Sequence, residues 1–399
     1  MKVIILAAGK ATRITPFSQT KPKALIKLAN IPLLEHTFKA LTKVTPMVTD
    51  VILVTGYKEA MIKEHFKDSY ENISISYVTQ HEQKGTGHAA LQAKEFFKTP
   101  NEQFLLLNGD DIYSWQDLQS LTQFPSTILL QEKEDVSAFG VVEVTQQIVH
   151  LNNQDVIVHK VKSFVEKPQG VPPSNFINTG AFAFTSKLFP ILEDLRESPR
   201  GEYELTDAVK ALAKQDKMHA IFTKHLWSPV GYPWNIIETT KLLLEKRLNN
   251  QIFHHGTVSS GAVIEEDVSI DRGSKIAKGV RITGLVAIGK NVTIKENCTV
   301  SGTVAIADNS VIEKNCIISN TIIGSSTIVK QNCRLHDSVI GDSVIIQENM
   351  ATNTILPDQT IKVQIKGKLF DTKLHQLGAF IADKIQLNQN TNPGEIVLG

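Results

Sequence analysis

Aliphatic side chains recur at every sixth position through much of the C-terminal third of the chain. The series runs without a break through Val258, Ile264, Ile270, Ile276, Ile282, Ile288, Ile294, Val300, Ile306, Ile312 and Ile318. A period of six fits neither an amphipathic helix nor an ordinary strand, but it is typical of a parallel β-helix in which each hexapeptide forms one side of a triangular coil. The pattern predicts a solenoid over residues 256–399.

Beyond Ile318 the spacing breaks. We expect it to resume through Ile322, Ile328, Ile340 and Ile346, with Arg334 interrupting the series. Residues 360–371 alternate like a β-hairpin, which predicts an arm inserted into the solenoid. The coils are then expected to restart at Gly378 and to continue through Ile381 and Leu387.

Composition limits the class of protein. A chain of 399 residues with 42% hydrophobic content is long enough for two or three domains. A net charge of +1 argues against a surface that binds polyanions, so we expect no nucleic-acid partner. Three cysteines without CxxC spacing indicate neither a disulfide framework nor a zinc site. No apolar run approaches the roughly 18 residues that span a bilayer. We therefore expect a cytoplasmic protein with no membrane partner.

Residues 1–248 alternate apolar strand candidates with amphipathic segments, which predicts a doubly wound, mostly parallel α/β domain. The expected strands are Val3–Leu6, Val51–Thr55, Ile73–Val78, Phe104–Asn108, Thr127–Gln131 and Ala181–Phe184. In such sheets ligands bind beyond the carboxyl ends of the strands, so the loops after Leu6, Val78 and Asn108 should face one crevice. The first of these loops is built of small residues and is followed by Arg13 and Lys23, which suggests phosphate chemistry.

The segment Leu6-Ala-Ala-Gly9-Lys-Ala-Thr-Arg13, with Pro22-Lys23, resembles the LAAGxGTR and PK signature of the sugar-1-phosphate nucleotidylyltransferases. Further segments match the family in order: Gln80–Ala89, Asn108-Gly109-Asp110, Phe139-Gly140, Val165–Pro168 and Asn178-Thr179-Gly180. The family often carries a left-handed hexapeptide β-helix at its C-terminus. The overall pattern looks most like N-acetylglucosamine-1-phosphate uridylyltransferase and its archaeal bifunctional relatives.

The resemblance implies a transfer in which a sugar-1-phosphate attacks the α-phosphorus of UTP or dTTP and expels pyrophosphate. It assigns Arg13 and Lys23 to catalysis, and it assigns nucleotide binding to Leu6, Ala7, Ala8, Gly9, Gln80, Gly85 and Thr86. Gly140, Glu166 and Asn178 match positions that bind hexose hydroxyls. Mg²⁺ is expected on Asp110 and Asn235, although Asn235 could instead cap a helix. The glutamine five residues before Gly85 favours uridine, and the expected product is UDP-N-acetylglucosamine or UDP-glucose.

Three points stay open in the sequence. Bifunctional relatives use the β-helix to acetylate glucosamine-1-phosphate with acetyl-CoA, but Gln331 stands where their basic histidine is expected. His336, five residues away, is either a substitute base or a surface or coil-corner histidine. Some relatives are non-catalytic regulatory or nucleotide-sugar-sensing proteins, although these often lose the phosphate-loop cations that are present here. Ala11 replaces the usual glycine, which is unfavourable only if the position needs positive φ. A homo-oligomer, a trimer through the β-helix, is also expected.

Overall fold

The computed structural model describes residues 1–151, 154–249, 251–356 and 358–398. Its contacts divide the chain into two compact units, each described separately below. The first unit comprises residues 1–10 and 34–229, and the second comprises residues 11–33 and 230–399. The segment 11–33 therefore groups by its contacts with the C-terminal part of the chain. The sequence-based division into domains 1–248 and 256–399 stays a prediction.

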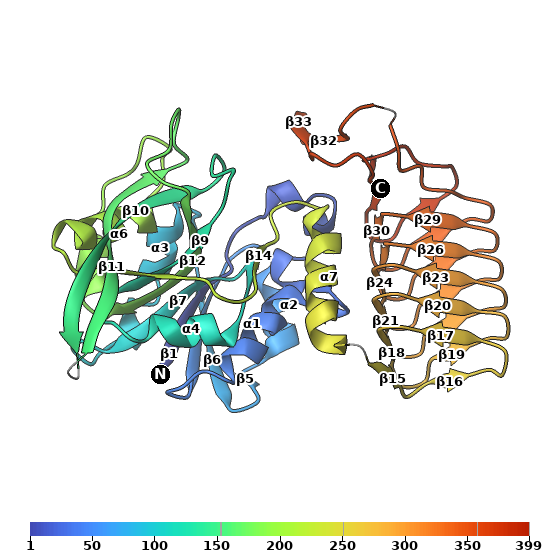
Figure 1. The fold of residues 1–399 in the computed structure, drawn as a ribbon, viewed down its shortest axis with the longest axis horizontal. Helices are drawn as coiled ribbons and strands as arrows, with labels where there is room; N and C mark the ends of the chain where they lie inside the picture. The colour runs from blue at the N-terminus through green and yellow to red at the C-terminus, as the bar shows by residue number, and fades with distance from the viewer. Residues whose placement is uncertain (152–153, 250, 357, 399) are drawn as a thin grey trace. The chain divides into compact units, whose positions relative to one another are not determined.

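The first unit is built on a mixed sheet with the strand order β10-β11-β13-β9-β12-β7-β1-β4-β6-β5 (Figure 1). Its strands are β1 (Lys2–Leu6), β4 (Asp50–Thr55), β5 (Ser69–Tyr70), β6 (Ile73–Thr79), β7 (Gln103–Asn108), β9 (Thr127–Glu132), β10 (Gly140–Leu151), β11 (Gln154–Glu166), β12 (Phe176–Thr185) and β13 (His219–Phe222). Strands β7, β1, β4 and β6 are parallel neighbours. Strand β12 adds to this group antiparallel to β7. The predicted strands are confirmed, whereas the long β10–β11 hairpin was not foreseen.

Helices cover the sheet because each has one apolar face. The helices of this unit are α1 (Leu33–Leu41), α2 (Glu59–Phe66), α3 (Thr86–Leu91), α4 (Trp115–Leu121), α5 (Leu188–Glu193) and α6 (Leu205–Lys214). Residues of α3, α5 and α6 form one buried cluster with Ile4, Phe104 and Leu130 of the sheet. Burial of each large apolar side chain contributes about 1.5–3 kcal/mol before chain entropy is subtracted. This packing fixes the strand ends from which the site loops emerge.

A small antiparallel pair, β8 (Asp111–Tyr113) and β14 (Trp227–Pro229), lies beyond β7 in the chain.

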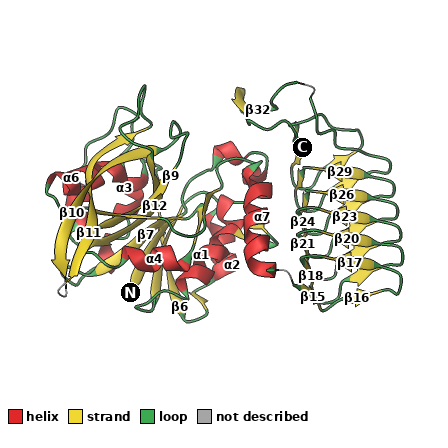
Figure 2. Ribbon diagram, in the orientation of Figure 1, coloured by secondary structure: helices red, strands yellow, loops and turns green. Residues whose placement is uncertain are grey.

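The second unit contains stacked coils whose short strands, joined by turns, form three parallel sheets within the described residues (Figure 2). The first sheet holds β15 (Ile252–His254), β18 (Val268–Ile270), β21 (Val286–Ile288), β24 (Val304–Ile306), β27 (Ile322–Ile323), β30 (Val339–Ile340), β34 (Phe380–Ile381) and β36 (Ile396–Val397). The second holds β16 (Thr257–Val258), β19 (Lys275–Ile276), β22 (Thr293–Ile294), β25 (Val311–Ile312), β28 (Ile328–Val329), β31 (Ile345–Ile346) and β35 (Gln386–Leu387). The third holds β17 (Val263–Glu265), β20 (Arg281–Thr283), β23 (Thr299–Ser301), β26 (Ile317–Ser319) and β29 (Arg334–His336). Three sheets of stacked parallel strands are consistent with the predicted left-handed β-helix.

The register of the coils explains both the regular spacing and its break. Ile270 pairs with Ile288, and Ile288 pairs with Ile306, so one full coil contains three hexapeptides. The next partner of Ile306 is Ile323, one residue earlier than that spacing would give. The expected inward positions Ile322 and Ile328 were therefore wrong by one residue. Ile323, Val329 and Leu335 occupy the core instead, and each is fully buried.

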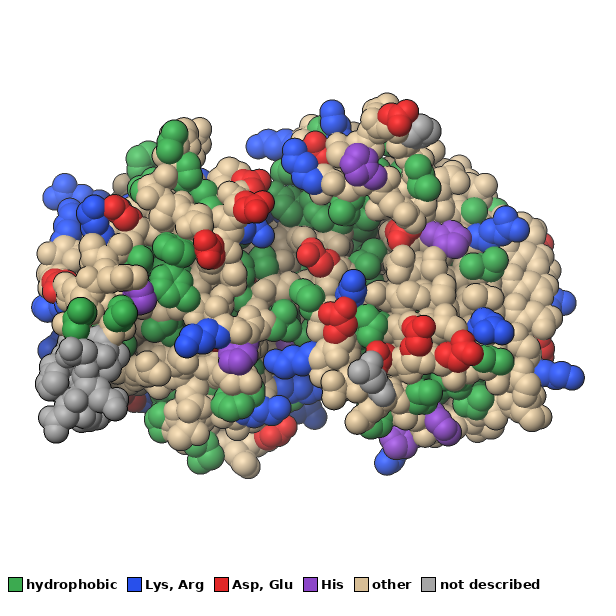
Figure 3. Space-filling model, in the orientation of Figure 1, with side chains coloured by type: hydrophobic (Ala, Val, Ile, Leu, Met, Phe, Trp, Pro, Cys, Tyr) green, Lys and Arg blue, Asp and Glu red, His purple; other side chains and the backbone are tan. Residues whose placement is uncertain are grey.

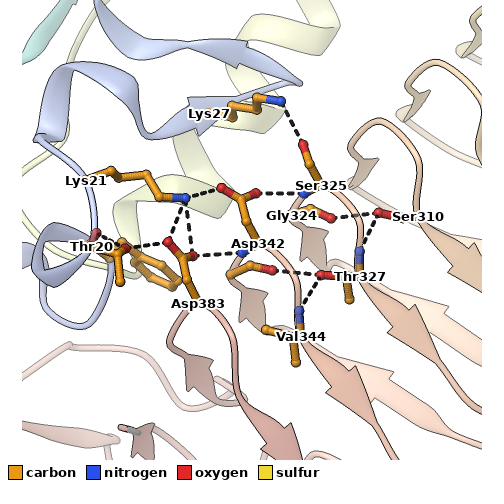
Figure 4. Close-up of polar contacts among 12 residues, drawn as sticks. Thr20, Lys21, Lys27, Ser310, Gly324, Ser325, Thr327, Asp342, Val344 and Asp383 are labelled. Carbon is orange, nitrogen blue, oxygen red and sulfur yellow. Dashed lines mark hydrogen bonds and ion pairs between the residues drawn. The ribbon is translucent and has the colours of Figure 1, made fainter. Parts of the chain in front are cut away.

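Polar and thiol side chains also stack inside the coils. Buried hydroxyls link successive turns: Ser310 Oγ donates to the carbonyl of Gly324, and Thr327 Oγ1 donates to that of Gly341 (Figure 4). The cysteines Cys298, Cys316 and Cys333 are buried and unbridged, as expected of small core residues. Burying hydroxyls is favourable here because each one is hydrogen-bonded.

The inserted arm is confirmed as an antiparallel hairpin of β32 (Lys362–Ile365) and β33 (Lys368–Asp371), after which the coils resume at β34. The second unit also holds α7 (Asn235–Leu248) and the short ladder of β2 (Lys27–Leu28) and β3 (Ile31–Pro32). Among the described residues, no helix is long and apolar enough to cross a membrane. Figure 3 shows cationic and anionic side chains interspersed on the face in view, in keeping with the net charge of +1.

Candidate active site

The loops that follow β1, β4 and β7 contact one another in the first unit. The Gly109 N–H donates to the carbonyl of Leu6 at 2.9 Å, and the Tyr57 N–H donates to that of Ala8 at 3.1 Å. A Cβ on Gly109 would lie 2.8 Å from the Leu6 oxygen, so only glycine permits this approach. The predicted crevice loops after Leu6 and Asn108 are therefore adjacent. Gly9 has open space around its Cα, which leaves its backbone accessible to a ligand.

Gln80, Gly85 and Thr86 form a second loop, which follows β6. The buried Gln80 amide donates to the Gly85 carbonyl at 3.1 Å, so the five-residue spacing corresponds to a hydrogen bond across the loop. Gly85 has a φ of 101°, and a Cβ there would lie 2.6 Å from the carbonyl oxygen of Tyr203. Thr86 Oγ1 accepts from the Leu205 N–H at 3.1 Å. The structure brings these three predicted residues together.

Two neighbours of this loop were not predicted. Gln83 Nε2 donates to the Ala8 carbonyl at 2.8 Å and so joins the Gln80 loop to the β1 loop. His88 Nδ1 lies 3.0 Å from Gln80 Nε2. Burial, assisted by Lys84, lowers the pKa of His88, which favours the neutral ring as a hydrogen-bond partner. Both residues lie inside the matched segment 80–89, but no spacing rule distinguished them from their neighbours.

Asp110 follows β7 after Gly109, and Asp111 begins β8. Asp110 is partly exposed and Asp111 is buried. Tyr113 OH donates to the Thr179 carbonyl at 3.0 Å and lies 3.4 Å from Asp111 Oδ2. Burial, with the charges of Asp111 and Asp110, raises the pKa of Tyr113, so its hydroxyl stays a donor. Asp111 thus has a structural partner in Tyr113.

The donor set of Asp110 fits Mg²⁺ in chemical terms. Mg²⁺ prefers hard oxygen ligands and is usually held by one or two carboxylates together with substrate phosphates and water. Within the described residues no group of three or more His, Cys, Asp or Glu side chains could form a complete protein cage. The assignment of the metal to Asp110 stays a prediction.

The three residues expected to bind the sugar lie on adjacent strands. Gly140 pairs with Glu166 across β10 and β11, and Val141 pairs with Ile177 of β12, next to Asn178. A Cβ on Gly140 would lie 2.5 Å from the Phe164 ring and 2.8 Å from Glu166 Oε2. The structure therefore brings Gly140, Glu166 and Asn178 together.

Electrostatics at this cluster depend on Glu166. Burial raises its pKa, and the nearby Arg200, with Nη2 at 3.7 Å from Glu166 Oε1, acts in the opposite direction. Asn178 Oδ1 accepts from the Gly180 N–H at 2.9 Å, which leaves the amide nitrogen as a donor. A carboxyl and an amide side by side suit a ligand that carries hydroxyl groups. Arg200 was not predicted, and its position in a loop after α5 gave no signal.

Arg13, Lys23 and Asn235 belong to the second unit. The Arg13 guanidinium lies 5.4 Å from the centroid of the Tyr232 ring, and Tyr232 stacks on Trp234 at 4.6 Å. Asn235, the first residue of α7, accepts a hydrogen bond from the Tyr232 N–H through Oδ1 at 2.9 Å. The N-cap residue of α7 is Trp234, and no side-chain cap hydrogen bond is present there, so the expected alternative of Asn235 as a helix cap is wrong. The assignment of Asn235 as a metal ligand stays a prediction.

The segment between Ala11 and Lys23 has a defined backbone. Ala11 adopts φ 48° and ψ 49°, in the left-handed region, so the position needs positive φ. Lys23 is buried and begins a 3₁₀ turn, Lys23–Leu25, that follows Pro22. Alanine in this conformation is strained by about 1–2 kcal/mol. The phosphate-loop segment thus keeps the glycine-type backbone without the glycine.

Comparison with known proteins places these features in context. A family model described as nucleotidyl transferase matches residues 2–246, and one described as GMPPB C-terminal domain matches residues 264–369. A bifunctional sugar-1-phosphate nucleotidylyltransferase/acetyltransferase of Sulfurisphaera tokodaii is 31% identical over 98% of this chain and 92% of its own length. A UTP–glucose-1-phosphate uridylyltransferase, AglF, of Haloferax volcanii is 30% identical over 62% of this chain and 98% of its own.

Two further comparisons cover only part of a chain. The bifunctional protein GlmU of Methanococcus maripaludis strain C7 is 35% identical, and the match covers 68% of this chain and 62% of that protein. The chain therefore spans less than two thirds of that relative's length. A crystal structure of UDP-glucose pyrophosphorylase complexed with UDP-glucose superposes with a TM-score of 0.52 and 26% identity. It covers 62% of this chain and 99% of its own.

Proposed function

Because the chain belongs to the nucleotidyl transferase family, we propose that it is a nucleotidylyltransferase that makes a nucleoside-diphosphate sugar. A hexose-1-phosphate oxygen attacks the α-phosphorus of UTP or dTTP, and pyrophosphate leaves. The observation that carries this proposal is the contact between the loops after β1 and β7. It places the carboxylate-bearing segment Asn108-Gly109-Asp110 beside the small-residue loop Leu6–Gly9.

Charge neutralisation is the main requirement, because both reactants are anions. Backbone N–H groups around Ala8 and Gly9 are suited to phosphate oxygens, whereas the Ala7 N–H already donates to the Val54 carbonyl at 2.8 Å. We assign Arg13 to the β- and γ-phosphates and to the departing pyrophosphate, and Lys23 to the α-phosphate or the sugar phosphate. Mg²⁺ would be held by Asp110 and Asn235, and when bound it supplies positive charge to the phosphate oxygens.

Base and sugar selection belong to the two clusters of the first unit. The Gln80 loop with Gly85 and Thr86 is assigned to the nucleobase, with uridine preferred. Gly140, Glu166 and Asn178 are assigned to the hexose hydroxyls. Two relatives are described by UDP-glucose or glucose-1-phosphate chemistry, and others are described as GlmU. The proposed product is therefore UDP-N-acetylglucosamine or UDP-glucose.

The test is a direct assay of pyrophosphate. The full chain is incubated with Mg²⁺, either UTP or dTTP, and each hexose-1-phosphate in turn. Arg13→Met and Lys23→Met are each expected to lower kcat/KM by about 100-fold or more, as expected for a lost electrostatic donor. Lys98→Met, an exposed lysine elsewhere, is the matched control and should stay within about twofold of wild type. Full turnover in both Arg13→Met and Lys23→Met would refute the assignment.

A second activity is favoured by one comparison. The Sulfurisphaera tokodaii relative, which matches along almost the whole chain, is described as bifunctional. In the β-helix His336 Nδ1 lies 2.5 Å from Ser319 Oγ, whereas the Gln331 amide donates to Glu348. If the β-helix acetylates glucosamine-1-phosphate, acetyl-CoA must release free thiol, and His336→Gln should abolish that release. Thiol release that survives in His336→Gln would exclude this histidine as the base.

The remaining proposals concern the state of the protein. A regulatory homologue is the non-catalytic alternative, and binding of nucleotide sugar without pyrophosphate release would favour it. We further propose a cytoplasmic homo-oligomer that associates through the flat sides of the β-helix, in keeping with the side-by-side assembly of solenoids. Light scattering of the purified chain would test a trimer.

A further inference from the structure

Residues 20–30, which include Lys23 of the signature, contact the coils of the β-helix within the second unit. Asn30 Nδ2 donates to the carbonyls of Ala287 and Ile306 at 3.1 and 3.0 Å. Lys27 Nζ donates to Ser325 Oγ at 2.8 Å. Lys21, nearer the N-terminus, reaches the next two coils (Figure 4). Residues 20–30 therefore contact five consecutive coils, at β21 and β24 and in the turns that follow β27, β30 and β34.

Lys21 is held by two carboxylates at one corner of these coils. Its Nζ contacts Asp342 and lies 3.0 Å from Asp383 Oδ2, and Thr20 Oγ1 also donates to Asp383. The side chain of Lys21 is 15% exposed and that of Asp383 is 5% exposed. Figure 4 shows the lysine pointing between the two acids. Breaking a buried ion pair by removing one partner is far more damaging than losing a surface pair, because the other charge stays buried.

The two carboxylates are themselves fixed by the coil backbone. Asp342 Oδ1 accepts from the Ser325 N–H, and Asp383 Oδ1 accepts from the Asp342 N–H, each at 2.7 Å. A Cβ on Gly341 would lie 2.4 Å from Asp383 Oδ1, so glycine leaves room for the carboxylate. Burial acts to raise the pKa of Asp342, but the charge and hydrogen bond of Lys21, the Ser325 N–H and the charge of Lys27 together outweigh it, and the pKa is lowered. Asp342 and Asp383 thus form a pair of carboxylates that the coil backbone holds in place.

We propose that Asp342 and Asp383 position the catalytic segment, with Lys21 as the positioning residue that transmits the β-helix geometry to Lys23. This inference rests on the proposed nucleotidyl transfer and adds a role for the β-helix in that reaction. Lys21 is joined to Lys23 by Pro22 alone, whose φ of −67° is fixed by its ring. A displacement of Lys21 should therefore also displace Lys23.

The consequence for the chemistry follows from the sensitivity of phosphoryl transfer to geometry. Misplacing a catalytic group by about 1 Å can lower the rate by about 100-fold. A positioning residue should act mainly on kcat, because the phosphate-binding groups remain present. A purely structural role would instead lower the folded fraction of the protein, and kcat per folded molecule would not change.

The experiment compares four full-length variants at fixed ionic strength. Lys21→Met removes the charge, and Lys21→Arg keeps it. Asp383→Asn keeps the oxygen that accepts from the Asp342 N–H but removes the negative charge. Lys27→Met is the matched control, because Lys27 hydrogen-bonds the neutral Ser325 on the same row of coils, and its charge acts on Asp342 less than that of Lys21 does. For each variant kcat and KM are measured per folded molecule, and hydrogen exchange is followed in residues 11–33.

We expect Lys21→Met to lower kcat by about tenfold or more, with KM for the sugar phosphate within about threefold of wild type. Lys21→Arg should recover most of kcat, Asp383→Asn should be intermediate, and Lys27→Met should stay within about twofold. Exchange should rise in residues 11–33 for Lys21→Met and not for Lys27→Met. If Lys21→Met does not fold, Asp383→Asn decides.

Failure of the proposed function and failure of the positioning role give different results. Wild-type protein that releases no pyrophosphate with any substrate pair refutes the proposed function, whatever the exchange data show. Active wild type combined with kcat within about twofold for both Lys21→Met and Asp383→Asn overturns the positioning role alone. Faster exchange with unchanged kcat has the same meaning, because the anchor would then serve stability without serving the reaction.

Discussion

Replacement of Ala11 by glycine tests the backbone of the phosphate-loop segment. Ala11 sits at φ 48° and ψ 49°, where the Cβ of an L-residue approaches the following carbonyl oxygen. The family signature has glycine at this position, which has no Cβ. Ala11→Gly is therefore expected to stabilise the second unit, against the usual direction of an Ala-to-Gly change.

The magnitude comes from two opposing effects. Alanine in the left-handed region is strained by about 1–2 kcal/mol. Glycine makes the unfolded chain more flexible, which lowers stability by about 0.4–1 kcal/mol. The net gain in the free energy of unfolding is about 0.5–1 kcal/mol. For a unit of this size the gain corresponds to a rise in Tm of about 1–4 °C.

Calorimetry is the suitable assay, because the two units can unfold in separate transitions. Ala24→Gly is the matched control from the same segment. Ala24 lies in the 3₁₀ turn Lys23–Leu25 and is buried, so glycine there loses a packed methyl group and adds freedom to the unfolded chain. Its expected effect is a loss of about 1–2 kcal/mol.

The two variants should therefore shift Tm in opposite directions. A fall in Tm for Ala11→Gly comparable to that for Ala24→Gly would show that Ala11 is unstrained, and the argument from its φ would be wrong. A gain in kcat is not required by this reasoning. Stability alone decides the outcome.

Three further predictions concern the core, the nucleotide loop and pH. Ile294→Ala, at a fully buried coil position, should cost about 2–5 kcal/mol in urea unfolding, against less than about 0.5 kcal/mol for the exposed Lys275→Ala; equal effects would refute the inward assignment. Gly85→Ala should lower stability by about 1–3 kcal/mol and raise KM for UTP, because φ is 101° and a Cβ meets a backbone carbonyl at 2.6 Å; an unchanged KM and Tm would contradict this. The ion pair with Lys21 lowers the folded-state pKa of Asp342, so its stabilising effect is complete above the ordinary value of 3.8 and is lost as the pH falls through the lower folded-state value. Acid unfolding followed by circular dichroism should accordingly be less steep in Asp342→Asn than in wild type, and identical curves would exclude the effect.

Much of the fold follows from local patterns. The strands from β1 to β12 that have continuous apolar runs were predicted because buried parallel strands need apolar residues on both faces. The coil register was right while each coil held three hexapeptides, as from Ile270 to Ile306. It slipped by one where Ile322 and Ile323 stand side by side, since two adjacent isoleucines fit the pattern equally well. Only the strand pairing distinguishes them.

Some residues of the candidate site could also be grouped from the sequence, and others could not. Residues at the ends of neighbouring strands, such as those of the Gln80 loop and the Asn108-Gly109-Asp110 segment, could be grouped from the sequence because parallel strands share one edge. The φ of Ala11 could not, since both signs were compatible with alanine. The contact of Lys21 with Asp342 joins residues 321 positions apart, and no periodicity relates them. Such long-range pairs can be identified only from the folded structure.

The row of contacts made by residues 20–30 fixes the number of coils in part of the solenoid. From β21 to β34 the segment crosses four inter-strand spacings of about 4.8 Å, or about 19 Å in all. Inserting or deleting one coil between β24 and β34 would displace the carboxylates from their lysine by a full step. Coils at the β16 end lie outside this interval and escape the constraint. Changes in solenoid length among related chains should therefore be found before β21 or after β34, where an added coil leaves the spacing between the contacts of Asn30 and Lys21 unchanged.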